Sequence, residues 1–362
     1  MPDSAERGTD MAGQKVTIYD VANELGISTA TVNRVLNNKP NVSDKMRKMV
    51  MDAVERTGYR PSRTAAALKR APVHVKLIAL VNIPEYSDVV LQGSEKAFAE
   101  LEDFNFYGEI IRLNYKVSYR DYIDMLYRCA EEGMDGLLLL GPHEDNIIKG
   151  AMEDIAKKYG IKFCVAQAVI NSPCNLLSIQ INGYANGRVA AELLESYLEP
   201  GQKVAVVTEN CVYSEHRASL KGFQEQIQQG KLTFAGVFEH NDEPELAAWL
   251  AEKIVRDIPD IKGIFLSTAN SITFCKRLEE LGYGGKIKIV ASDIFPALSE
   301  LMERGIVQAT IYKSPNLLGE QMVRSMYSHL MEGKTFESNV MLINPRILLN
   351  SNKELIQNYQ FN

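Results

Sequence analysis

Residues 17–37 read TIYDVANELGISTATVNRVLN, and this stretch decides the fold of the N-terminal part of the chain. An apolar stripe at helical spacing predicts a first helix and consists of Ile18, Val21, Ala22 and Leu25. Thr17 and Asp20 favour the start of this helix, as a capping side chain and an acidic first turn. Gly26 favours its end, because glycine adopts the left-handed conformation without strain, and Ser28 can cap a second helix. The stretch therefore predicts two short helices joined by a tight turn.

The second helix and a third complete a small three-helix domain. Val32, Val35 and Leu36 point to its interior. The third helix runs between Ser43 and Gly58, with Met46, Val50, Ala53 and Val54 facing the core. The outward residues of the second helix are Thr29, Ala30, Asn33 and Arg34. They lie near the helix start, where DNA base edges come within reach of a helix-turn-helix. A domain that binds no nucleic acid could carry the same apolar pattern, so the pattern alone leaves that alternative open.

The charge of the chain is divided unevenly. The whole chain carries a net charge of −6, but residues 14–70 hold eleven Lys and Arg against five Asp and Glu, a net of +6. Residues 1–13 carry −2, so residues 71–362 carry −10. The N-terminal part of the chain, residues 14–70, is thus basic, and the rest, residues 71–362, is acidic. This division indicates that only the N-terminal part docks on DNA.

Residues 59–70, YRPSRTAAALKR, follow the three helices. Pro61 disfavours helix before it, and Ser62 can cap a helix over 62–69 that is too short to be stable alone. Its one large apolar side chain is Leu68. Leucine is among the side chains that proteins insert between base steps in the minor groove. The segment is therefore predicted to fold against DNA and a second copy of the chain.

At these residues the chain resembles the lactose-repressor (LacI/GalR) family of transcription regulators. The resemblance rests on VTIYDVANELGISTATVNRVLN (16–37) and VSDKMRKMVMDAVERTGYRPSRTAAALKR (42–70), and extends over essentially everything from Val16 onward. By position, it implies that Thr29, Ala30 and Arg34 read major-groove bases. It implies phosphate contacts for Thr17, Ser28, Thr31 and Asn37. Leu68 falls on the family's hinge-helix leucine that wedges into the operator, and Lys69 on the lysine that often follows it.

The body begins with VKLIALVN (75–82), a nearly continuous apolar run of the kind that a strand buried on both faces requires. Helical patterns separate further strand-like runs at 107–113, 136–140, 162–168, 203–208, 232–239, 263–267 and 287–292. The alternation predicts parallel sheets with right-handed crossovers. There are too many strands for one small sheet, so two α/β lobes with a cleft between them are predicted, similar to the periplasmic sugar-binding-protein fold that the family uses. The predicted crossings between the lobes lie near 171–176, 293–297 and 331–335.

The sequence thus predicts an all-α helix-turn-helix head and an α/β, two-lobed, periplasmic-binding-protein-like body with parallel sheets. Its parts are a disordered lead-in (1–14), a DNA-binding domain (15–61), a hinge helix or linker (62–71), and an effector-binding and dimerisation domain (72–362).

Polar residues near the carboxyl ends of the predicted strands are candidate effector-binding residues, because ligands of parallel sheets gather there. Asp293 matches the family carboxylate that accepts hydrogen bonds from sugar hydroxyls, with a helix cap as its alternative role. Asn270 either contacts hydroxyls through its amide or caps a helix. Tyr86 and Asp88 follow the first strand and are either ligand contacts or parts of a solvated loop.

Two positions depart from the family pattern. Ser219 stands where many members carry a sugar-binding arginine, and Arg217 lies two residues earlier. Either Arg217 replaces that arginine or the effector needs none. Asn182 stands where aspartate is common. These three residues complete the predicted effector set.

No sequence pattern indicates an enzyme, a metal site or a membrane protein. Dinucleotide-binding, Walker and G-x-S-x-G motifs are absent, and the five histidines lack the spacing of zinc ligands. No apolar run approaches the ~20 residues that span a bilayer. The five cysteines form no C-x-x-C pair, which indicates reduced, mostly buried thiols. No catalytic residue, metal or cofactor is expected.

The N-terminus, MPDSAERGTDMAG (1–13), is polar and has no apolar signal core, so the protein is expected to stay in the cytoplasm. The resemblance implies a nucleoid-associated repressor that binds a near-palindromic double-stranded DNA operator as a homodimer. Its expected effector is a small sugar or polyol, and no membrane partner is expected. Two alternatives remain at this point: a solute-binding protein with no DNA-binding role, and a sugar-modifying enzyme. The first would show no salt-dependent DNA affinity, and the second would need a general acid–base pair in the cleft.

Overall fold

The computed structural model describes residues 16–36, 39–59, 71–268 and 271–356. It forms two compact units, residues 1–71 and residues 72–362, which are referred to below as the head and the body. The predicted lead-in and almost all of the predicted hinge helix lie outside the described residues.

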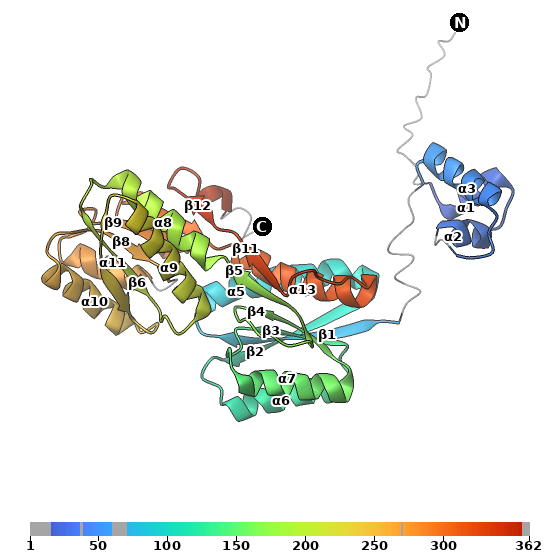
Figure 1. The fold of residues 1–362 in the computed structure, drawn as a ribbon, viewed down its shortest axis with the longest axis horizontal. Helices are drawn as coiled ribbons and strands as arrows, with labels where there is room; N and C mark the ends of the chain where they lie inside the picture. Colours follow the sequence, from blue (N-terminus) through green and yellow to red (C-terminus); the bar gives the residue numbers. More distant parts are fainter. Residues whose placement is uncertain (1–15, 37–38, 60–70, 269–270, 357–362) are drawn as a thin grey trace, which may run out of the picture. The chain divides into compact units, whose positions relative to one another are not determined.

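The described part of the head contains the helices α1 (Ile18–Leu25), α2 (Thr29–Leu36) and α3 (Asp44–Thr57) (Figure 1). Thr17 and Asp20 cap α1 reciprocally. The backbone N–H of Thr17 donates to the Asp20 carboxylate at 2.7 Å, and the backbone N–H of Asp20 donates to Thr17 Oγ1 at 3.4 Å. Gly26 ends α1 with a φ of 62°, and Ser28 Oγ accepts from the backbone N–H of Thr31 at 3.2 Å. The predicted helices and their caps are confirmed.

A small apolar core holds the three helices of the head together. Its buried members are Val21, Ala22, Val32, Val35, Val50 and Ala53. Arg56 on α3 also donates from Nε to Glu24 Oε1 on α1 at 3.0 Å. The predicted inward faces of all three helices are therefore correct.

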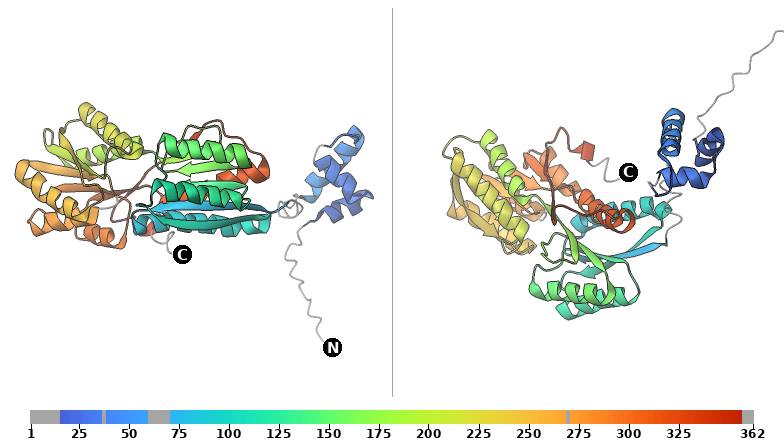
Figure 2. Two further views of the ribbon diagram at one scale, coloured as in Figure 1. Left: turned by 90° about the horizontal axis from the view of Figure 1, so that it is seen from below. Right: turned by 45° about the vertical axis from the view of Figure 1, so that its right-hand side comes forward.

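The first lobe of the body is a six-stranded parallel sheet covered by helices on both faces, as Figure 2 shows. Its strands are β1 (Val73–Val81), β2 (Phe106–Asn114), β3 (Gly136–Leu140), β4 (Lys162–Ala166), β5 (Asn175–Ile181) and β11 (Val340–Ile343), in the order β11-β5-β4-β3-β1-β2. The helices α5 (Pro84–Leu101) and α13 (Pro315–Glu332) cover one face, and α6 (Tyr119–Glu131) and α7 (Asn146–Tyr159) cover the other. A 3-10 turn, η1 (Glu102–Phe104), follows α5.

The second lobe repeats this strand order. Its strands are β6 (Lys203–Thr208), β7 (Thr233–Glu239), β8 (Ile261–Leu266), β9 (Lys288–Ser292), β10 (Ala309–Tyr312) and β12 (Arg346–Leu348), in the order β12-β10-β9-β8-β6-β7. Only β12 runs antiparallel to its neighbour in the described sheet. One face carries α8 (Gly183–Tyr197) and α9 (Ser214–Gln229), and the other carries α10 (Pro244–Asp257), α11 (Ser271–Glu280) and α12 (Pro296–Glu303).

Burial on both faces explains the apolar runs of the sequence. Along β1, Leu77 belongs to the core beneath α5 and α13, whereas Ile78 belongs to the core beneath α6 and α7. Successive side chains of a strand point to opposite faces, so both must be apolar when helices cover both faces. The prediction of two α/β lobes with parallel sheets is confirmed.

The chain crosses between the lobes at three places: at residue 182 after β5, at residues 313–314 after β10, and at residues 344–345 between β11 and β12. The predicted crossings are wrong, since each lies earlier in the chain. The error has one cause: β5, β10 and β11 directly precede the crossings, and the sequence prediction missed all three. β5 carries the buried polar side chains Ser178 and Gln180, and β10 and β11 span only four residues each.

Glycines allow one helix pair in each lobe to approach closely. A Cβ atom at Gly187 on α8 would lie 1.8 Å from the carbonyl oxygen of Ser219 on α9. A Cβ atom at Gly319 on α13 would lie 1.9 Å from the carbonyl oxygen of Val90 on α5. Neither position has room for a larger side chain without separating the two helices.

We expect Gly187→Ala to destabilise the body by about 1–3 kcal/mol, because the added methyl group must push α8 away from α9. Gly150→Ala in α7 is the control. A Cβ atom there meets nothing within 4 Å, so its stability should be unchanged or slightly higher. Urea titrations followed by circular dichroism measure both. Equal midpoints for the two variants would contradict the close helix contact.

Candidate functional site

A cavity of about 480 Å³ lies between the two lobes of the body. Segments that follow the strands form its wall. They contribute Asn82 after β1, Gln167 after β4, Glu209 after β6, Asp293 after β9 and Lys313 after β10. Parallel strands end at the same edge of a sheet, so the residues that follow them meet there. The two sheets thus present their carboxyl edges to one cavity.

Asp293, in this wall, combines three features that each lower the stability of the folded protein. Its φ is 59°, its side chain is buried, and its Oδ2 atom has no hydrogen-bond partner among the described residues. Its Oδ1 atom accepts from the backbone N–H of Lys313 at 3.1 Å. Burial raises the pKa of Asp293 to about 6, against the opposing attraction of Lys313. A buried acceptor without a partner is costly, so Oδ2 is suited to accept a hydrogen bond from a bound ligand.

Lys313 supplies a buried positive charge beside Asp293. Its Nζ atom lies 2.9 Å from Glu215 Oε1, which belongs to the first turn of α9. Burial on its own would lower the pKa of Lys313, but the carboxylates of Glu215 and Asp293 raise it overall. Burial acts to raise the pKa of Glu215, and Lys313 reverses this effect and lowers it. The pair therefore stays charged at neutral pH.

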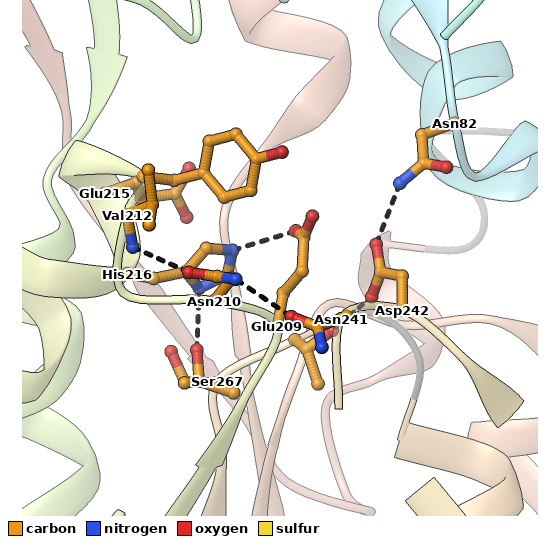
Figure 3. A network of polar contacts seen from close by, with 12 residues as sticks. Asn82, Glu209, Asn210, Val212, Glu215, His216, Asn241, Asp242 and Ser267 are labelled. Carbon is orange, nitrogen blue, oxygen red and sulfur yellow. Dashed lines mark hydrogen bonds and ion pairs between the residues drawn. The ribbon is translucent and has the colours of Figure 1, made fainter. Parts of the chain in front are cut away.

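A second polar network follows β6 and β7 (Figure 3). His216 Nδ1 lies 2.9 Å from Thr208 Oγ1, and His216 Nε2 lies 3.2 Å from Glu209 Oε2. The backbone N–H of Asp242 donates to His240 Nδ1 at 3.0 Å, and burial lowers the pKa of His240 to about 4, so this ring is neutral. Burial, and then the charge of Glu209, raises the pKa of Asp242 to about 6. This end of the cavity is therefore rich in carboxyl groups.

Side-chain hydrogen bonds between described residues join the lobes across the cavity. The pairs are Asn82 with Asp242 (Nδ2–Oδ2, 3.0 Å; Figure 3), Ser214 with Glu144 (Oγ–Oε1, 2.7 Å), and the hydroxyls of Tyr115 and Tyr213. Each pair takes one residue from each lobe. The lobes are thus held together by polar groups that a ligand in the cavity can reach.

Three of the predicted effector residues, Tyr86, Arg217 and Asp293, line the cavity. Burial raises the pKa of Tyr86 well above its usual value, so its hydroxyl stays protonated. Arg217 is exposed, and its Nη1 atom donates to the carbonyl oxygens of Cys211 at 3.0 Å and Val212 at 2.6 Å.

Two predicted effector residues lie outside the lining because other contacts hold them. Asp88 on α5 forms an ion pair with Arg112 at 2.6 Å. Ser219 is buried at the contact with Gly187, and its Oγ atom accepts from Ser267 Oγ at 3.2 Å. The expectation that these residues contact ligand is therefore not supported by their positions.

Asn182 also lies outside the lining, at the first crossing between the lobes. Its Oδ1 atom accepts from the backbone N–H of Ala185 at 3.1 Å and so caps α8. Its Nδ2 atom donates to Asn344 Oδ1 at the third crossing, at 2.9 Å. The residue links two crossings rather than contacting the cavity. Asn270 lies outside the described residues.

The sequence prediction missed much of the cavity wall. Three of the missed residues directly follow strands whose predicted bounds match or nearly match the observed ones. The ends of these strands could therefore have identified Asn82, Gln167 and Glu209. Lys313 follows β10, which was not predicted. Asp242 lies in the turn after β7, where the sequence signals only a loop.

None of the predicted DNA-contacting residues of α2 belongs to its buried core residues, which are Val32 and Val35. Ala30, Asn33 and Arg34 are exposed, and Thr29 and Thr31 are half-buried. Thr17 and Ser28 are exposed at the starts of α1 and α2. Asn37, Leu68 and Lys69 lie outside the described residues.

The remaining predictions concern thiols, metals and membranes. Four of the five cysteines are buried, as predicted, and all five are free thiols. Within the described residues, no group of three His, Cys, Asp or Glu side chains could hold a metal ion. No helix in the described part of the chain has the length and apolar character needed to cross a bilayer.

Two family models match the chain. Residues 17–62 match the bacterial regulatory proteins of the lacI family, and residues 78–335 match the periplasmic binding protein domain. The second match covers more than half of the chain.

Curated relatives include catabolite control protein A of Priestia megaterium, which is 26% identical over 219 residues, 60% of this chain and 62% of that protein. The HTH-type transcriptional repressor PurR of Photobacterium profundum is 28% identical over 222 residues, again 60% of this chain and 62% of that protein. The chain thus spans about three fifths of the length of these relatives.

Among solved structures, GanP, a glucose-galactose binding protein from Geobacillus stearothermophilus, shares the fold of the body. Its TM-score is 0.68 at 19% identity, over 78% of this chain and 99% of that chain. With its helix-turn-helix head and its two-lobed body, the chain belongs to the LacI family of bacterial regulatory proteins and carries a periplasmic binding protein domain.

Proposed function

We propose that the chain is a ligand-responsive, DNA-binding transcription regulator that acts as a repressor on the nucleoid, in the cytoplasm. The observation that carries this proposal is the pairing of two surfaces in one chain. The head exposes a polar face on α2, and the body encloses a polar cavity between two lobes. Relatives named as a catabolite control protein and a transcriptional repressor support the same interpretation.

Each head is proposed to read half of a near-palindromic operator, with the second half read by the head of a second copy in a homodimer. The net charge of +6 on residues 14–70 attracts the phosphates, and the charge of −10 on residues 71–362 keeps the body away from DNA. The residues proposed to contact DNA are Thr17, Ser28, Thr29, Ala30, Thr31, Asn33, Arg34, Asn37, Leu68 and Lys69.

The cavity is proposed to bind a small sugar or polyol. Asp293 Oδ2 supplies an acceptor, the Tyr86 hydroxyl can donate, and the Gln167 amide can do both, which suits a ligand with several hydroxyl groups. The fold shared with a glucose-galactose binding protein supports this class of ligand.

A ligand between the lobes is proposed to change their relative orientation and therefore the spacing of the two hinge segments (62–71) in the dimer. A helix this short is marginal by itself, so a change of a few kcal/mol moves it between the DNA-bound and the released state. A ligand that favours the bound state acts as a corepressor, and one that favours the released state acts as an inducer.

Arg34→Ala should weaken binding to a selected operator by about 10- to 100-fold, because Arg34 is exposed on the proposed reading face of α2. Lys262→Ala, at an exposed position of the body, removes the same charge and should leave operator binding unchanged. Fluorescence anisotropy on an operator selected from random duplexes measures both. Equal effects of the two substitutions would count against the proposed reading face.

Leu68→Ala should weaken specific operator binding far more than non-specific binding, because a minor-groove wedge acts only at the operator centre. The same anisotropy assay, repeated with a scrambled duplex, separates the two. An equal loss on both duplexes would contradict the wedge.

Asp293→Asn should stabilise the ligand-free protein at neutral pH. Because the pKa of Asp293 is raised to about 6, the folded state binds its proton more tightly than the unfolded state, and stability falls as pH rises from about 4 to 6. The variant lacks this loss of stability. Its free energy of unfolding should therefore equal that of the wild-type protein near pH 4 and exceed it by about 2–3 kcal/mol above pH 6. Denaturation at a series of pH values measures it.

The same variant should lose the rise in melting temperature that a binding sugar or polyol gives the wild-type protein. Asp88→Asn is the matched control, since Asp88 lies outside the cavity lining, and it should keep that rise. A variant that is less stable at pH 7 yet still stabilised by ligand would exclude the proposed role of Asp293.

A further inference from the structure

Carboxyl groups outnumber cations in the cavity wall. Six acidic residues of the described chain line it: Glu144, Asp145, Glu209, Glu215, Asp242 and Asp293. The permanent cations in the lining are Lys313 and Arg217. An anionic ligand would enter a field of the same sign as its own charge, whereas a cationic ligand would be attracted.

Neither cation is directed at the carboxyl groups after β6 and β7. Lys313 Nζ lies 2.9 Å from Glu215, and its remaining electrostatic influence falls mainly on Asp293. Arg217 Nη1 donates to two backbone carbonyls in the loop before α9. The charge of Lys313 thus lies beside Glu215 and Asp293, and the backbone before α9 holds the guanidinium group of Arg217.

Glu209 and Asp242 form the acidic end of the cavity. Figure 3 shows their carboxyl groups next to each other, and the charge of Glu209 is one of the two main causes that raise the pKa of Asp242. Their side chains are only 19% and 7% exposed. Water screens two such buried carboxyl groups poorly, so a cation placed between them would relieve their repulsion.

Another part of the cavity wall offers hydrogen-bonding partners suited to hydroxyl groups. Asp293 Oδ2 is buried and has no partner among the described residues, and Tyr86 lines the same wall. A cavity of about 480 Å³ has room for a monosaccharide.

We propose that the effector carries an amino group: it is an amino sugar or amino polyol whose ammonium group lies between Glu209 and Asp242 and whose hydroxyl groups reach Asp293 and Tyr86. This inference rests on the proposed role of the cavity as the effector site. Sugar phosphates and sugar acids are excluded by the same carboxyl groups.

The test is isothermal titration calorimetry of the full chain with three matched series of probes. Each neutral hexose (D-glucose, D-galactose, D-mannose) is compared with its 2-amino derivative and its uronic acid. We expect at least one amino sugar to bind about tenfold or more tightly than its neutral partner, and the uronic acids to bind weakest.

Glu209→Gln and Asp242→Asn remove one charge each with little change of shape, and either should reduce the preference for the amino sugar to about twofold. Glu245→Gln, at an exposed position of α10, removes the same charge outside the cavity and should keep the full preference. Urea titration of each variant checks that it is folded, and the two cavity variants serve as replicates of one test.

Equal binding of amino and neutral sugars, tighter binding of an acid, or no binding of any amino probe would overturn the inference. Operator binding measured with and without each probe keeps the two proposals apart. A neutral sugar that alters operator binding supports the regulator and overturns the amino ligand. An amino sugar that binds tightly but leaves operator binding unchanged supports the amino ligand and counts against the regulatory switch.

Discussion

The buried contact between Lys313 and Glu215 is the interaction on which the organisation of the body depends. Lys313 is the last residue before the chain leaves the second lobe, its Nζ atom contacts the first turn of α9, and its backbone N–H donates to Asp293. A buried charge without a partner would cost several kcal/mol. One residue thereby fixes the start of a helix, the end of β9 and the path of the chain between the lobes.

Local rules made the head predictable. A cap at Thr17, a glycine at Gly26 and a helical apolar stripe act within a few residues, so the sequence alone located all three described helices. The fold class of the body was equally predictable, because most of the strands covered on both faces are almost entirely apolar. The positions of the crossings could not be predicted from the sequence, since β5 contains buried polar side chains and β10 and β11 are too short for a clear pattern.

The cavity was only partly predictable for a different reason. A polar residue after a strand can point into the cavity, into a helix contact or toward a crossing, and the sequence does not distinguish these directions. Asp293 lines the cavity, Ser219 lies at the contact between two helices, and Asn182 links two crossings. The features that single out Asp293 as a candidate ligand contact, its positive φ and its unsatisfied oxygen, exist only in three dimensions.

The hydrogen bond between Asn182 and Asn344 ties the first crossing to the third, and the backbone N–H of Asn182 also donates to the carbonyl oxygen of Ile343 at 2.9 Å. These two crossings therefore behave as one pivot, and the segment at Lys313 and Ser314 is the other. Two pivots define an axis, and a rotation of the lobes about it would have to break the hydrogen bonds that join them across the cavity. Because Lys313 belongs both to a pivot and to the cavity wall, a ligand that displaced it would act directly on that axis, without a chain of intermediate residues.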